Sequence, residues 1–320
     1  MNQKAIYRPL FLEAWKNTWR HKRLWLLGIF AAVMASGGLF ESLSGSWQTA
    51  LKGRMMLEQY INGTLPGYQW LVSYGRYLAA MEPFQQYLLS ALIVLAFFGL
   101  VSFGALAQGA ILAGGLKKTP AKFCELIQNG QTFFWRILGL DVLGKLGLGL
   151  VFLITVAPVA FLNPLPYGWH QYPPFISLVL FLAGAIFVTT LQMLSLAGVV
   201  RKHLNIRAAV NEAWDIFRLH LAVTFELGVL LFIISFLAAL ATLIVLIILA
   251  LLLTLLFVVA ILVSSSGLYL LAIFISLATF IVVALLAAGL LSTFQYTVWL
   301  LYFEEAGRFG IIPKIRRLLS

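Results

Sequence analysis

Long apolar runs alternate with short polar segments along this chain. The longest run, from Val229 to Val263, has 35 residues without a charged residue, Gly, Pro, Asn or Gln. About 20 apolar residues in a helix cross the hydrocarbon core of a bilayer, and a charged residue at its centre costs about 2.5 to 3.5 kcal/mol. The run therefore predicts a membrane-spanning element that is longer than one crossing needs, so it tilts, bends, projects beyond the core or forms a re-entrant pair.

The same pattern predicts an all-α, polytopic transmembrane helix bundle of about six spans. Polar residues separate apolar segments at about 24–40, 87–115, 137–162, 175–200, 222–263 and 268–302, with an outer segment at 41–86. That outer segment is close to the lower size limit of an independent domain. We therefore expect a single integral membrane domain over residues 1–320.

Composition and charge placement extend this prediction to topology. Only 10% of the residues are charged and 62% are hydrophobic, whereas soluble proteins have about 25% charged residues. Eighteen of the 22 Lys and Arg residues lie before the first span, between the second and third, after the fourth, or after the last. The positive-inside rule then places both termini in the cytoplasm. We expect a multi-pass protein of a cell (inner) membrane. Because this placement explains the net charge of +11, we expect no nucleic-acid partner.

Three related segments precede the odd-numbered spans: EAWKNTWR at 13–20, NGQTFFWR at 129–136 and EAWDIFR at 212–218. Each has an aromatic residue followed by an arginine, which are Arg20, Arg136 and Arg218. Such segments are typical of amphipathic helices at the membrane surface, and the pattern indicates three hairpin repeats. The three arginines are candidate contacts for anionic lipid headgroups, or they only orient the chain during insertion.

These motifs, with the segment YFEEAGR after the last span, resemble a broad group of poorly characterised six-span prokaryotic membrane proteins. The group includes the membrane domain found beside glycerophosphodiester phosphodiesterases. In that family the hydrolase is a separate soluble domain. The resemblance therefore implies a membrane module, and we expect no phosphodiesterase activity.

Three ionisable residues are candidates for an intramembrane polar site. Asp141 and Lys145 lie four residues apart in the third span, and Glu226 lies early in the fifth. Ionisable groups inside a membrane indicate an ion, proton or substrate site, unless they neutralise each other within the bundle. Glu226 either joins this site or pairs with Arg218. Gln108, Gln192 and Gln295 indicate a polar pathway or hydrogen bonds between helices.

Enzyme motifs are missing from the sequence. It contains two aspartates, and it has no HExxH, GxSxG or Walker A motif and no metal-ligand spacing among its four histidines. We expect no enzyme activity, cofactor or metal.

The first hypothesis is a non-enzymatic membrane protein that organises lipids, anionic ones in particular, or protein partners, including further copies of itself. The alternative is a transporter or permease subunit, which predicts a hydrated cavity at Asp141 and Lys145 instead of a sealed site.

Overall fold

The computed structural model describes residues 7–35, 74, 75, 77, 81–115, 122–155, 158 and 172–306, and over these residues the fold is all-α without strands. The helices are α1 (Tyr7–Arg20), α2 (Arg23–Ala35), α6 (Pro83–Gly114), α7 (Phe123–Thr155), α9 (Tyr172–Lys202), α10 (Ile206–Leu219), α11 (Leu221–Leu262) and α12 (Ser266–Ala306). The predicted fold class is confirmed.

Five of these helices, α6, α7, α9, α11 and α12, are long and apolar enough to cross a membrane. The chain is thus a multi-pass membrane protein. The expected first span begins as α2, whose apolar part is shorter, and its last residues, 36–40, lie outside the described residues. Most of the outer segment 41–86 also lies outside them. A count of six spans stays a prediction.

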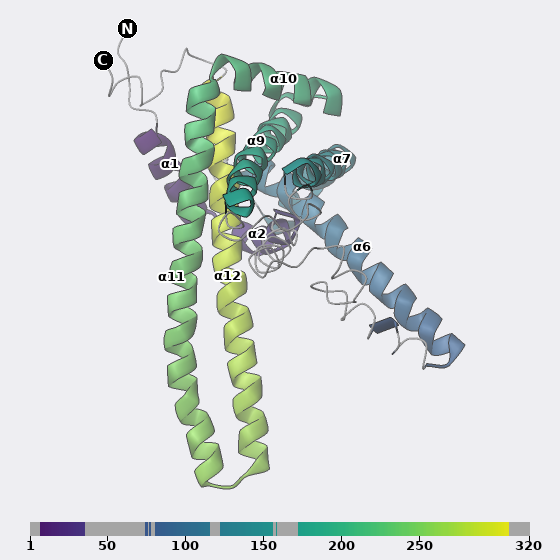
Figure 1. The fold of residues 1–320 in the computed structure, drawn as a ribbon, viewed down its shortest axis with the longest axis vertical. Coiled ribbons are helices and arrows are strands. Elements are labelled where there is room, and N and C mark those ends of the chain that lie inside the picture. Colours follow the sequence, from purple (N-terminus) through teal and green to yellow (C-terminus); the bar gives the residue numbers. More distant parts are fainter. Residues whose placement is uncertain are drawn as a thin grey trace.

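The longest apolar run forms one continuous helix and not a re-entrant pair. α11 has 42 residues, which at about 1.5 Å per residue makes about 63 Å, roughly twice the hydrocarbon core. The chain turns at Ser264, whose φ is +52°, and α12 runs back beside α11 (Figure 1). The hydroxyl of Ser265 accepts a hydrogen bond from the amide of Leu268 at 3.4 Å. The polar segment SSSG therefore supplies both the turn and the start of α12.

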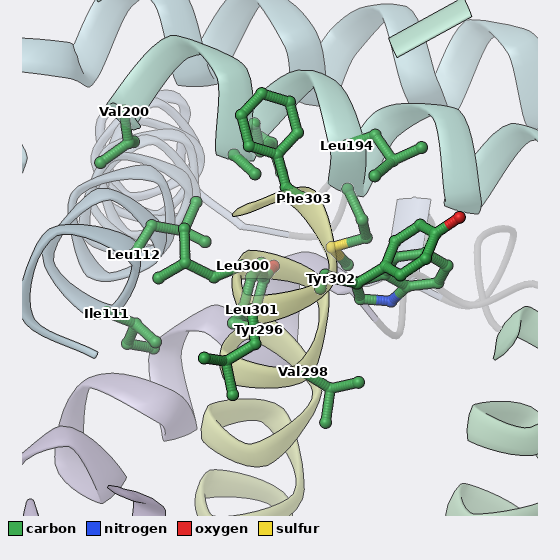
Figure 2. Packing of buried hydrophobic residues seen from close by; sticks show 14 of the residues in the cluster. Ile111, Leu112, Leu194, Val200, Tyr296, Val298, Leu300, Leu301, Tyr302 and Phe303 are labelled. Atoms are coloured by element: carbon green, nitrogen blue, oxygen red, sulfur yellow. The ribbon is translucent and has the colours of Figure 1, made fainter. Parts of the chain in front are cut away.

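The buried core lies in one half of the bundle, which we call the packed half. It contains residues 104–114 of α6, 126–144 of α7, 190–200 of α9, 223–231 of α11 and 289–303 of α12. Figure 2 shows Ile111 and Leu112 of α6 and Leu194 and Val200 of α9 gathered around residues 296–303 of α12. The ends of five long helices are therefore fixed in one apolar cluster.

Beyond the packed half, α6 and the α11–α12 hairpin point in different directions (Figure 1). Between residues 232 and 288, only Ala260, Ala272 and Ser276 are buried. The remaining surface of the hairpin is apolar all round, as expected for helices whose solvent is lipid.

Two helix crossings depend on glycine. At the α2–α12 crossing, a Cβ on Gly28 would lie 2.2 Å from the main-chain oxygen of Gly289. At the α6–α7 crossing, a Cβ on Gly130 would lie 2.5 Å from the main-chain oxygen of Leu106. The absent side chains let the helix backbones approach closely, as small residues do in membrane bundles.

The first and third predicted repeats each contain a separate short helix before the apolar one, α1 before α2 and α10 before α11. The second does not, because NGQTFFWR lies inside the continuous helix α7. The expectation of a separate amphipathic helix there is wrong. Gly130 does not break α7, since it packs tightly against the backbone of α6.

Candidate functional site

Asp141 is the most deeply buried ionisable residue of the predicted polar site. It lies on α7 in the packed half, and its side chain is 1% exposed. Its Oδ1 atom accepts a hydrogen bond of 2.8 Å from Nε2 of Gln192 on α9. Burial of a carboxylate is costly unless donors compensate it, so this contact stabilises the group. The predicted role of Gln192 in hydrogen bonding between helices is confirmed.

Gly144 makes room for this contact. A Cβ at this position would lie 2.2 Å from Oε1 of Gln192. The glutamine side chain therefore occupies the space that a larger residue on α7 would fill. The sequence does not predict the contact of Gln192 with Asp141, because 51 residues separate them and no local pattern connects them.

Lys145 does not join Asp141 in the interior. Its attractive charge acts on Asp141, but its own side chain is exposed on the surface of the bundle. Residues four apart on a helix are offset by about 40°, and α9 contacts α7 at Asp141. Lys145 is therefore not buried beside Asp141, and the neutralisation of the two charges by each other stays a prediction.

Glu226 contacts a different element. Its Oε2 atom accepts a hydrogen bond of 2.8 Å from the hydroxyl of Tyr7 on α1. Glu226 thereby links the start of α11 to the surface helix α1, whereas Asp141 is linked to α9. That Glu226 is a third member of the polar site stays a prediction.

Gln108, on α6, completes the buried polar group around Asp141. Its side chain is 1% exposed and lies within interaction range of the Asp141 carboxylate. Among the described residues, Oε1 of Gln108 and Oδ2 of Asp141 have no hydrogen-bond partner. Two buried acceptors without donors are candidate positions for a proton, because such atoms are rarely left unpaired.

A second candidate site is a basic and aromatic surface on α1 and the start of α2. The indole rings of Trp15 and Trp19 meet edge to face at 5.7 Å, and those of Trp19 and Trp25 at 5.0 Å. Nε1 of Trp25 donates a hydrogen bond of 2.9 Å to the main-chain oxygen of Thr18, which fixes the angle between the two helices. Tryptophan is enriched at the membrane–water interface, so this row indicates headgroup depth.

The three candidate arginines have different environments. Arg20 lines a cavity at the turn between α1 and α2. Arg136 donates a hydrogen bond of 3.0 Å from Nη1 to the main-chain oxygen of His203, in the connection between α9 and α10. Arg218 is exposed in the last turn of α10. The side chains of Arg20 and Arg218 are therefore exposed to contact headgroups, whereas Arg136 is bound to the main chain. The three positions are not equivalent.

Two ion pairs hold the same end of the bundle together. Arg201 pairs with Glu304 between α9 and α12, and Lys202 pairs with Glu212 between α9 and α10. Both acidic partners were absent from the sequence-based site. Glu304 belongs to the segment YFEEAGR, so part of that motif has a structural role at the end of α12.

The chain matches no protein-family model, no curated protein and no solved structure. The resemblance to the six-span family stays a prediction. Within the described ranges, no group of three or more His, Cys, Asp or Glu residues could hold a metal ion.

Proposed function

We propose that this chain is a non-enzymatic protein of a cell (inner) membrane, with both termini in the cytoplasm, that organises anionic lipids or partner proteins. The observation that carries the proposal is the row of Trp15, Trp19 and Trp25 on the surface, beside the exposed basic residues of the α1–α2 turn. Aromatic rings set the depth of such a surface, and each basic residue near an anionic leaflet contributes about 1 kcal/mol of attraction.

The packed half supports this function because it holds the surface helices rigidly. α1 is joined to α11 through Tyr7 and Glu226, and it packs on α12 through the ring contact of Trp15 and Phe294 at 6.0 Å. α10 is joined to α9 through Lys202 and Glu212. Basic and aromatic groups are thus presented at fixed positions on a bundle that is anchored by its long apolar helices.

The experiment is purification of the full chain from its native membrane in mild detergent or polymer discs, followed by mass spectrometry of lipids and proteins. We expect anionic phospholipid to be enriched over its fraction in the bulk membrane, with a protein partner or a second copy as the other specific product. A lipid content equal to that of the bulk membrane, without a reproducible protein partner, contradicts the proposal.

A transporter or permease subunit is the second candidate function. It is favoured by the unpaired oxygens of Asp141 and Gln108 in the packed half, because a transported proton or ion needs such acceptors. Reconstitution into vesicles with an internal pH indicator tests it. Proton flux in the wild type that Asp141→Asn abolishes supports a transporter, and equal flux in protein-free vesicles excludes a proton pathway through this site.

A further inference from the structure

The turn between α1 and α2 borders a cavity of about 210 Å³, which we call the α1–α2 cavity. Four consecutive basic residues line the cavity, Arg20, His21, Lys22 and Arg23, and the complete lining contains no acidic residue. The rest of the lining is mainly apolar and comes from three directions: Trp19 and Leu24 beside the turn, Gly114 at the end of α6, and Leu126 at the start of α7. The cavity therefore combines a basic rim with an apolar floor.

We propose that the α1–α2 cavity binds the phosphate group of an anionic phospholipid. This inference rests on the proposed function and names its binding site. Arg20 and Arg23 carry planar guanidinium groups, which donate paired hydrogen bonds to phosphate oxygens.

The aromatic row explains why the phosphate belongs to a lipid and not to a soluble molecule. Trp19 lines the cavity and also contacts both Trp15 and Trp25. Lys22 lies with its Nζ atom 5.9 Å from the centre of the Trp19 ring. The basic rim and the depth-setting indoles are thus parts of one surface. A lipid can place its phosphate on the rim and the start of its acyl chains over the apolar floor.

The other candidate arginines, Arg136 and Arg218, do not line the α1–α2 cavity with its basic rim and apolar floor. Arg136 already donates to the main chain at His203, and Arg218 lies on α10, away from the residues that line the cavity. Arg8, Lys16 and Arg207 are exposed and do not line the cavity, so they provide a matched control of equal charge.

The test measures binding of phosphatidylglycerol to the full chain by native mass spectrometry, with phosphatidylcholine and inorganic phosphate as separate arms. The cavity variant carries Arg20→Gln, Lys22→Gln and Arg23→Gln, and the control carries Arg8→Gln, Lys16→Gln and Arg207→Gln. We expect the cavity variant to lose about tenfold in occupancy of the tightest-bound phosphatidylglycerol, and the control to lose about twofold or less. Equal losses in the two variants overturn the inference. Inorganic phosphate that binds as tightly as phosphatidylglycerol overturns the assignment to lipid.

A measurement on the wild-type chain covers the case in which the cavity variant does not fold. Photoactivatable phosphatidylglycerol is incorporated into discs with the protein, and the crosslinked peptides are sequenced. Crosslinks within residues 19–24 support the inference, and crosslinks confined to other segments overturn it. Failure of the proposed function differs from failure of this inference. If the proposed function is wrong, the wild type binds phosphatidylglycerol and phosphatidylcholine equally.

Discussion

Gln192 donates a hydrogen bond of 2.8 Å to Asp141 across the interface of α9 and α7. The contact exists because Gly144 leaves the space that the amide group of Gln192 occupies. Three residues that look unrelated in the sequence thus form one unit in the packed half. This unit connects α7 to α9 at the buried carboxylate of Asp141.

We predict that Gln192→Ala destabilises the bundle by about 1 to 2 kcal/mol, because it removes a donor from a buried carboxylate. In a double-mutant cycle with Asp141→Ala, the combined loss should be smaller than the sum by about 0.6 to 1.7 kcal/mol. Reversible unfolding in mixed micelles measures both quantities. Leu146→Ala is the control, and since the Leu146 side chain is 65% exposed it should change stability by about 0.5 kcal/mol or less. Additive losses would show that the hydrogen bond does not couple the two helices.

A second prediction concerns the crossing of α2 and α12. Gly28→Ala places a Cβ 2.2 Å from a main-chain oxygen, and the backbone of Gly289 cannot move aside as a side chain can. The helices must separate, which should cost about 1 to 3 kcal/mol and lower the thermal midpoint. Gly99→Ala on α6 is the matched control, because a Cβ there has nothing within 4 Å. Alanine is the better helix former, so the control should be neutral or stabilising by up to about 1 kcal/mol. Equal melting of the two variants contradicts the close approach.

The sequence predicts those parts of the fold that depend on local pattern. The unbroken run from Val229 to Val263 identifies α11, and the serines after it identify the turn into α12. The role of Arg136 could not be found in this way, because its acceptor at His203 lies 67 residues further along the chain. The position of Lys145 depends on the small angular offset from Asp141 and on which helix covers that side, which the spacing alone does not define.

Arg136 and Arg218 should differ in their effects, although their motifs look alike. Arg136→Gln removes a hydrogen bond to the α9–α10 connection, where His203 has a φ of +54°. We expect faster amide hydrogen exchange in residues 203–206 with unchanged retention of anionic lipid. Arg218→Gln removes the same charge from an exposed site, so exchange in that connection should stay unchanged. The same exchange profile for both variants would mean that the contact at His203 has no structural role.

The last prediction tests the topology with the single cysteine. Cys124 is exposed near the start of α7, one of the segments whose positive charge predicts a cytoplasmic location. A membrane-impermeant maleimide should therefore label intact cells poorly and label them fully after the membrane is opened. A Cys124→Ala, Ser265→Cys variant moves the thiol to the α11–α12 turn, on the far side of α11 from Glu226. That variant should label in intact cells. Labelling of Cys124 from outside would reverse the orientation and place the basic surface of α1 away from the cytoplasmic leaflet.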